Sequence, residues 1–169
     1  MKIFLIGFMG SGKTYWAKMW AQQSSLAVHD LDALIEAAEN LSVEKIFEEK
    51  GESYFRQKET ETLKGFLTKD NFILSCGGGT PCFNDNIQWM NNNGTTVYLK
   101  CHPQKILQNV LAEKQKRPLI KKINEGELLF FIEQKLKERE SFYNQAKIIL
   151  QTEEINNETI LYIINQINE

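Results

Sequence analysis

The sequence has few residues that bind metals or form disulfides. Its 169 residues include only two histidines, His29 and His102, and three cysteines, Cys76, Cys82 and Cys101. No two cysteines form a Cys-x-x-Cys pair, and no histidine stands at a spacing typical of a zinc site. We therefore expect no structural zinc, and we interpret the cysteines as reduced thiols of a cytoplasmic protein.

Long apolar runs and a strong excess of one charge are missing as well. The 20 Lys and Arg residues nearly balance the 22 Asp and Glu residues, and the net charge of −2 gives no reason to expect nucleic acid as a partner. No apolar run approaches the ~20 residues that span a bilayer, so we expect no membrane partner. The short run Ile3–Ile6 leads toward Gly-Ser-Gly-Lys-Thr rather than a cleavage site, which indicates a buried strand and not a signal peptide.

The chain also lacks repeats, low-complexity tracts and Pro/Gly-rich linkers, so we expect residues 1–169 to form one domain. Short, fully apolar runs are typical of parallel strands covered on both faces. They predict strands at Lys2–Ile6, Ala27–Asp30, Phe72–Cys76, Thr95–Cys101 and Lys147–Gln151. Longer helical patterns lie between them, which favours an α/β fold with right-handed crossovers.

Helices are expected from Lys13 to about Gln23, over Leu31–Lys50, over Ser53–Leu67, up to about Gly94, from Pro103 onward and over Ile155–Ile167. Ser42 is a candidate N-cap for the latter half of the second helical region, and Gly51 is a candidate stop. Asn84 or Asp85 could cap the helix that ends near Gly94.

The segment Lys114–Gly126 reads KQKRPLIKKINEG, and Pro118 interrupts any helix there. It is basic and polar, which predicts an exposed, mobile segment. A solvated loop and a functional lid both remain open from these residues alone.

Residues Gly7 to Thr14 read GFMGSGKT and satisfy the phosphate-loop pattern G-x-x-x-x-G-K-[ST] between a predicted strand and a predicted helix. Successive N–H groups of such a loop form an anion nest, and the helix N-terminus adds partial positive charge. Lys13 can reach the β- and γ-phosphates, while the Thr14 hydroxyl can bind Mg²⁺. The loop predicts ATP or GTP binding. The sequence contains nothing that resembles the guanine-reading NKxD motif, and no extra domain that could couple hydrolysis to mechanical work. A kinase is therefore favoured over a switch GTPase or a motor ATPase.

Three further clusters suggest an acceptor site. Asp30 and Asp32 follow the second predicted strand; if this segment is extended, both carboxylates point the same way, one toward Mg²⁺ and one toward a substrate hydroxyl. Arg56 and Glu59 share a helix face, either as a surface ion pair or with Arg56 as a clamp for a carboxylate. The three glycines that start at Gly77 cost conformational entropy, which favours a close approach of backbone to a ligand.

In this order and spacing, the motifs resemble those of the shikimate kinases over roughly residues 1 to 146. The resemblance rests on the phosphate loop, Asp30-Leu-Asp32, Gly51-Glu52-Ser-Tyr-Phe55-Arg56-Gln-Lys-Glu59, Gly77-Gly78-Gly79, Arg117-Pro118-Leu119, and Arg139 four residues before Tyr143. It implies a P-loop fold of nucleoside-monophosphate-kinase type, with a five-stranded parallel sheet in the order 2-3-1-4-5 and a mobile lid at about residues 114–126. It also implies Mg²⁺-dependent transfer of the ATP γ-phosphate to the 3-hydroxyl of shikimate, a step of chorismate and aromatic amino acid biosynthesis. We expect the protein to be a monomer.

The resemblance assigns roles residue by residue. Asp32 is expected as base or orienter of the acceptor hydroxyl, with Lys13 and Arg117 stabilising charge on the phosphates. The metal would lie at Thr14 and Asp30. The implied nucleotide contacts are Gly10, Ser11, Gly12, Lys13, Thr14, Tyr15, Arg117 and Gln151. The implied shikimate contacts are Asp32, Phe47, Phe55, Arg56, Glu59, Gly77, Gly78, Gly79 and Arg139, with the two arginines gripping the carboxylate.

One position departs from the family pattern, because Gln151 stands where members often have an acidic residue near the adenine. Two other functions fit these residues less well. A gluconate-type kinase would share the phosphate loop but would not need Arg56, Arg139 and the glycine run together. A nucleotide-binding regulatory module without catalysis would have no need of an acceptor base such as Asp32.

Overall fold

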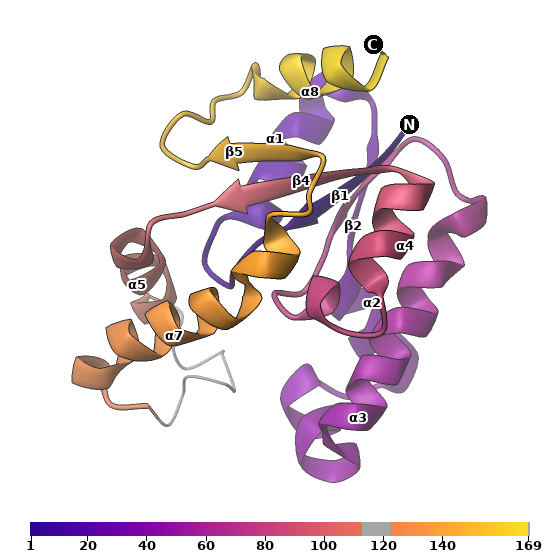
Figure 1. Ribbon diagram of the computed structural model, residues 1–169. Coiled ribbons are helices and arrows are strands. Elements are labelled where there is room, and N and C mark those ends of the chain that lie inside the picture. The colour runs from indigo at the N-terminus through magenta and orange to yellow at the C-terminus, as the bar shows by residue number, and fades with distance from the viewer. Residues whose placement is uncertain (113–122, 169) are drawn as a thin grey trace.

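The computed structural model describes residues 1–112 and 123–168. Its centre is a parallel sheet of five strands in the order β2-β3-β1-β4-β5, as the family resemblance implied (Figure 1). The strands are β1 (Lys2–Ile6), β2 (Ala27–Asp30), β3 (Phe72–Ser75), β4 (Thr95–Lys100) and β5 (Ile148–Gln151). All five sequence-predicted strands are present with bounds that agree within one residue at each end. Because the strands are parallel, their carboxyl ends meet at one edge of the sheet.

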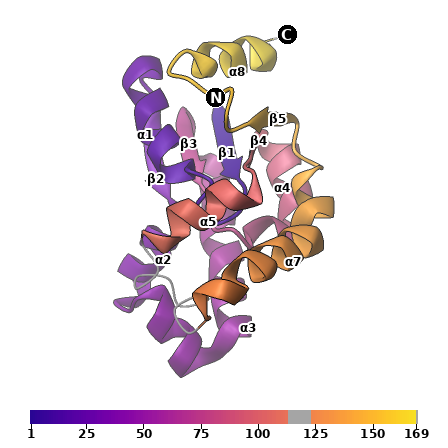
Figure 2. The same cartoon turned by 90° about the vertical axis from the view of Figure 1, so that its left-hand side faces the viewer.

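Helices cover both faces of this sheet (Figures 1 and 2). The elements are α1 (Lys13–Ser24), α2 (Leu31–Glu39), α3 (Val43–Lys64), the 3₁₀ turns η1 (Gly65–Thr68) and η2 (Thr80–Cys82), α4 (Asn86–Asn93), α5 (Pro103–Leu111), α7 (Glu125–Tyr143) and α8 (Thr159–Asn168). In the described part of the chain, no helix is long and apolar enough to cross a membrane.

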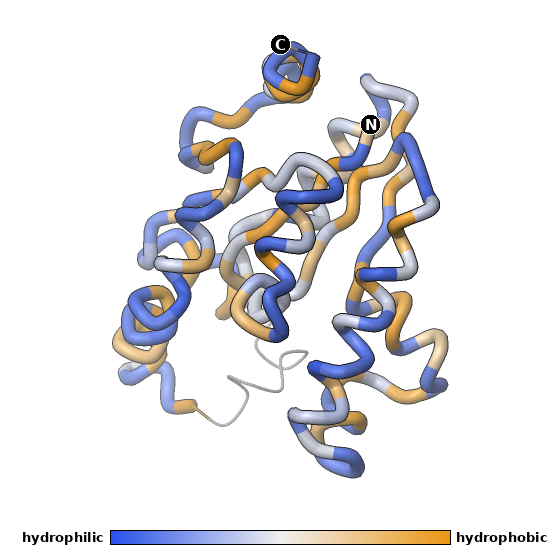
Figure 3. Tube along the Cα trace, turned by 45° about the vertical axis from the view of Figure 1, so that its right-hand side comes forward, coloured by the Kyte–Doolittle hydropathy of each residue, from blue (hydrophilic) through white to orange (hydrophobic). Residues whose placement is uncertain are grey.

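Strand β1 lies at the centre of the core, because successive side chains of a strand point to opposite faces. Phe4 and Ile6 pack with residues of α2, α3 and α4, whereas Ile3 and Leu5 pack with residues of α1 and α8. All four side chains are fully buried. Figure 3 shows the same concentration of hydrophobic residues along the central strands. The unbroken apolar run in the sequence thus reflects burial on both faces.

The helical region predicted over Leu31–Lys50 consists of two helices, and the second starts at the predicted N-cap, Ser42. Asn40 takes a left-handed conformation (φ 53°) and ends α2, and the Ser42 hydroxyl caps α3 by accepting from the Lys45 N–H at 3.3 Å. The predicted stop at Gly51 is confirmed as a break within α3: its φ of 82° and ψ of 167° are not helical, and the chain then resumes as helix to Lys64, as predicted for the segment from Ser53. The kink redirects the second half of α3, which carries Arg56 and Glu59.

The other helix starts follow local chemistry to different degrees. Pro103 occupies the first turn of α5, as expected for a residue with fixed φ. Asp85 precedes α4, but its side chain makes no capping bond, because both Asn84 and Asp85 take left-handed backbone conformations. The last helix begins at Thr159 rather than Ile155.

Candidate active site

A cleft of about 1100 Å³ lies at the carboxyl edge of the sheet. It is lined by the phosphate loop, by residues that follow β2, β3 and β4, by one face of α5, and by the turn after β5. The sequence-predicted residues that line it are Gly10, Ser11, Gly12, Lys13, Thr14, Tyr15, Asp30, Asp32, Gly77 and Gly78. The topology therefore brings the phosphate loop and the two aspartates, Asp30 and Asp32, to one site.

The phosphate loop has the conformation that its glycines permit. Gly12 has a φ of 88° and stands immediately before α1, so the helix N-terminus opens onto the cleft. Gly10 has a φ of 77°, and a Cβ there would lie 2.7 Å from Val110 Cγ1 on α5. The Lys13 ammonium donates to the carbonyls of Gly7 at 2.8 Å and Phe8 at 2.9 Å. The lysine is thus held against the loop, at the place where phosphates would bind.

Three side-chain oxygens gather beside the loop. The Thr14 hydroxyl donates to Asp30 Oδ2 at 2.9 Å, and it lies 3.3 Å from the Ser75 hydroxyl. Sequence reasoning missed Ser75. It ends β3 and pairs in register with Leu5 and with Asp30, so its place follows from strand order and not from any local motif.

The predicted geometry of the acid pair was wrong, although both acids line the cleft. Asp30 ends β2 in an extended conformation, but Leu31 already begins α2, so Asp32 lies in the first helical turn and not on a continuing strand. The Asp30 side chain itself favours this turn, because its Oδ1 caps the helix by accepting from the Ala33 N–H at 3.2 Å. Asp32 reaches the cleft through the helix instead of through strand alternation.

Asp32 occupies a site that opposes its ionisation. Burial, followed by the neighbouring carboxylates of Glu59 and Asp30, raises its pKa to about 7, while Lys13 and Arg56 act in the other direction. Its Oδ1 is buried and has no hydrogen-bond partner in the described part of the chain. A buried carboxylate oxygen without a donor is costly, so this atom is suited to meet a ligand hydroxyl.

This environment predicts that Asp32 destabilises the ligand-free fold. Its folded pKa of about 7 exceeds the ordinary value of 3.8, so the folded state binds more protons and stability falls as pH rises between those values. Asp32→Asn cannot ionise, and we expect it to raise the free energy of unfolding by ~2 kcal/mol or more at pH 8 and by less at pH 5.

Urea unfolding in EDTA without nucleotide would measure the difference at each pH. Asp70→Asn, at an exposed surface aspartate, is the matched control and should change little. A gap between Asp32→Asn and wild type that is equal at both pH values would contradict the electrostatic cause.

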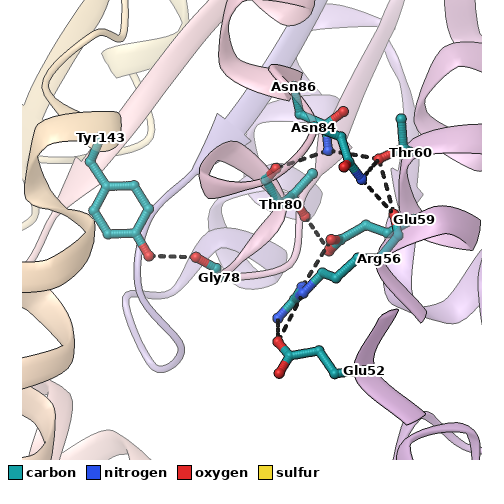
Figure 4. Close-up of polar contacts among 9 residues, drawn as sticks. All are labelled: Glu52, Arg56, Glu59, Thr60, Gly78, Thr80, Asn84, Asn86 and Tyr143. Carbon is teal, nitrogen blue, oxygen red and sulfur yellow. Dashed lines mark hydrogen bonds and ion pairs between the residues drawn. The ribbon is translucent and has the colours of Figure 1, made fainter. Parts of the chain in front are cut away.

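Arg56 is almost buried, with 8% of its surface exposed, and both sides of its guanidinium are occupied. Its Nη1 donates to Glu59 Oε2 at 2.9 Å, while Nε and Nη2 donate to Glu52 Oε1 at 3.2 and 3.1 Å (Figure 4). Glu59 is fully buried and also accepts from the Thr80 hydroxyl at 2.6 Å. The i,i+3 pair is therefore a buried network and not the surface ion pair considered from sequence.

Aromatic rings surround the same guanidinium. The Arg56 Cζ lies 5.9 Å from the ring centre of Phe47 and 5.3 Å from that of Phe55, both of which were predicted. The Arg56 Cζ lies closer, at 4.3 Å, to the ring centre of Phe83, which the sequence did not predict as a site residue. Phe83 follows η2, and only the tertiary fold places it over a side chain of α3.

The glycine run lies against the predicted substrate residues, one glycine to each. A Cβ on Gly77 would lie 2.8 Å from Asp32 Oδ1, and a Cβ on Gly79 would lie 2.6 Å from Arg56 Nη2. A Cβ on Gly78 would lie 3.3 Å from Arg139 Nη1. Three polar side chains from α2, α3 and α7 thus converge on this loop, and a side chain at any of its three glycines would crowd one of them. The half-buried Arg139 also places its Cζ 5.5 Å from the ring centre of Phe8, beside the phosphate loop.

The predicted nucleotide contact at Gln151 needs correction. Gln151 is exposed at the end of β5 and borders a separate depression of about 440 Å³ with residues of α8. Its neighbours Thr152 and Glu153 line the cleft instead. The main chain turns after the last strand residue, which directs the following side chains inward.

The residues of α5 that line the cleft were also missed. They include Gln104, Lys105, Gln108 and Asn109. Asn109 donates to the Gly10 carbonyl at 2.7 Å and so ties α5 to the phosphate loop. The rule that ligands lie beyond the carboxyl ends of parallel strands could have pointed to the segment after β4.

The lid prediction lies mostly outside the described residues. Arg117 falls there, as do Pro118 and Leu119. The C-terminal bound of the predicted segment is corrected, because Glu125 and Gly126 already belong to α7.

Comparison with known proteins identifies close relatives. The model of the shikimate kinase family matches residues 9–168. The chain is 39% identical to the shikimate kinase of Bacteroides thetaiotaomicron over 155 residues, covering 92% of this chain and 89% of that protein. It is 40% identical to the shikimate kinase of Phocaeicola vulgatus over 154 residues, which cover 91% of this chain and 88% of that protein.

Solved structures show the same likeness. The crystal structure of the Bacteroides thetaiotaomicron shikimate kinase superposes with a TM-score of 0.90 at 36% identity, over 98% of this chain and 97% of that one. The structure of the Acinetobacter baumannii shikimate kinase in complex with shikimate gives a TM-score of 0.84 at 28% identity, over 99% of this chain and 92% of that one.

Proposed function

The chain belongs to the shikimate kinase family and is an ATP-dependent kinase of the shikimate pathway, and on this premise we propose which of its residues carry the reaction. The γ-phosphoryl group of ATP passes in line to the 3-hydroxyl of shikimate, which gives shikimate 3-phosphate and ADP. The observation that carries the assignment is the convergence of Asp32, Arg56 and Arg139 on the glycine run beside the phosphate loop.

The phosphate loop would hold the triphosphate. Lys13 releases the Gly7 and Phe8 carbonyls and turns to the β- and γ-phosphates, where its charge stabilises the transferring group. Thr152 and Glu153 line the same cleft and would lie near the base, in place of Gln151. Arg117, placed by family resemblance, would add positive charge from the lid.

The oxygens of Thr14, Asp30 and Ser75 fit Mg²⁺, which prefers oxygen ligands and usually keeps waters and substrate phosphates in its shell. When bound, the ion would supply positive charge to the β- and γ-phosphate oxygens. Asp30 would hold it from the end of β2, with the Thr14 hydroxyl turning from Asp30 to the ion.

Asp32 would receive the acceptor hydroxyl. Its buried Oδ1 has no donor in the described part of the chain and lies beside the position of Gly77. A hydroxyl that donates to this oxygen would be oriented toward the phosphate, and its proton would pass to the carboxylate as the new P–O bond forms.

Arg56 and Arg139 would bind the shikimate carboxylate from two sides of the glycine run. The Nε/Nη2 edge of the Arg56 guanidinium cannot bind a substrate carboxylate while both nitrogens donate to Glu52. The Glu52 side chain is 56% exposed, so the substrate carboxylate can take its place while Glu52 moves into solvent. The buried Glu59 keeps its own bond to Nη1 and holds the guanidinium in position.

The function is tested by offering the enzyme a panel of hydroxylated acids and sugars with Mg·ATP and following ADP release. We expect shikimate to be the preferred acceptor by a wide margin. Equal or faster turnover of gluconate or another sugar acid would overturn the substrate assignment.

The carboxylate clamp predicts a specific effect of Arg139→Lys. Lysine keeps the charge but loses the planar fork that pairs with a carboxylate. We expect the KM for shikimate to rise ~10-fold or more, because a charge-assisted bond contributes roughly 1.5–3 kcal/mol. Affinity for ATP measured without shikimate should stay nearly unchanged.

Lys137→Arg, at an exposed cation of the same helix, is the control and should leave both constants unaltered. An analogue in which a neutral amide replaces the carboxylate should bind wild type poorly and lose less on mutation. If wild type uses the acid and the amide equally well, the clamp does not exist.

A further inference from the structure

The glycine run is held in place by Tyr143, a residue without a role in the reaction proposed above. Tyr143, at the end of α7, is fully buried, and its hydroxyl donates to the Gly78 carbonyl at 2.6 Å (Figure 4). Its ring stacks on that of Tyr98 with centroids 4.9 Å apart. Both the ring and the hydroxyl of Tyr143 are therefore fixed, and the hydroxyl has one clear acceptor.

The other hydrogen bonds of the loop leave two donors available. The Thr80 N–H donates to the Gly77 carbonyl at 3.1 Å, and the Cys82 N–H donates to the Gly79 carbonyl at 2.9 Å. Within the described part of the chain, the N–H groups of Gly78 and Gly79 have no such partner. Free backbone donors beside a cleft are suited to bind a ligand oxygen.

The Tyr143 bond fixes the direction of one of these donors, the Gly79 N–H. A trans peptide is planar, so the Gly79 N–H points opposite to the Gly78 carbonyl. The carbonyl points to α7, and the N–H therefore points away from α7, toward the side where Arg56 lies (Figure 4). Without Tyr143, a peptide between two glycines could rotate at little cost.

We propose that Tyr143 is a positioning residue for shikimate: its hydroxyl fixes the Gly78–Gly79 peptide so that the free Gly79 N–H meets a ring hydroxyl of the substrate. The proposal rests on the placement of shikimate argued above. It also gives α7 two linked tasks, because Arg139 lies one helical turn before Tyr143 and its Nη1 would lie 3.3 Å from a Cβ on the same glycine.

The test is Tyr143→Phe, which keeps the stacked ring and removes only the hydroxyl. A neutral hydrogen bond contributes about 0.5–1.5 kcal/mol net, so we expect the KM for shikimate to rise about 3- to 10-fold. The KM for ATP should stay within about twofold, because the phosphate loop makes no bond to this hydroxyl. Tyr98→Phe removes a neighbouring hydroxyl from the same ring stack, and it should leave both constants unchanged.

Deoxy analogues separate positioning from a loss of structure. Shikimate lacking either the 4- or the 5-hydroxyl should be tested with both enzymes, and for one analogue the advantage of wild type over Tyr143→Phe should vanish. An advantage that persists with both analogues would overturn the proposal. So would a wild-type KM for shikimate in Tyr143→Phe, or an equal rise for ATP. If wild type itself fails to phosphorylate shikimate, the proposed function is at fault and not the role of Tyr143.

Discussion

Lys13→Ala should lower kcat by about 10³-fold or more, since charge stabilisation of the transferring phosphoryl group supplies most of the rate in such kinases. Lys13 is 9% exposed, and its ammonium lies within the phosphate loop, bonded to two of the loop's carbonyls. Phosphate oxygens bound there would take over those donors. No other cation on α1 can reach the loop, because Lys18 is exposed and lies further along the helix.

The measurement is ADP release at saturating shikimate and Mg·ATP, with Lys18→Ala as the matched control. The control should retain wild-type turnover. Thermal unfolding of both variants checks that the loop still folds, because two carbonyls lose their donor in Lys13→Ala. Turnover of Lys13→Ala within tenfold of wild type would remove the basis for the phosphate-loop assignment.

The fold was predictable because its determinants are local. The apolar run of β1 is buried on both faces, and the glycines of the phosphate loop fix both the end of the strand and the start of α1. Ser42 and Pro103 mark helix starts by their own hydrogen bonding and backbone geometry. The strand order, however, came from family resemblance, because periodicity contains no information on which strands are neighbours.

The candidate site was predictable in its residues more than in its geometry. Asp32 was named from its spacing to Asp30, but the helix that starts at Leu31 places it differently. The glycine run was interpreted as a close approach of backbone to a ligand, and it also leaves room for three side chains from different helices. Ser75 and Phe83 carry no local signal, because only the packing of β3 and η2 against other elements brings them to the site.

Asp32→Asn should lower kcat by at least ~10²-fold, the contribution expected of a positioned base. Asparagine keeps the size of the side chain and can still accept a hydrogen bond, but it cannot take the proton of the acceptor hydroxyl. The affinity for ATP should change little, because the orphaned Oδ1 faces the glycine run rather than the phosphate loop.

The same substitution should stabilise the ligand-free protein, since it removes a carboxylate whose ionisation the site opposes. A variant that unfolds at higher urea concentration while losing most of its turnover cannot owe that loss to misfolding. This opposition between stability and activity separates a catalytic carboxylate from a structural one. Steady-state kinetics with shikimate, paired with urea unfolding at pH 8, measures both sides. An unchanged kcat would show that Asp32 is not the base, and another group near the acceptor hydroxyl would then have to take its proton.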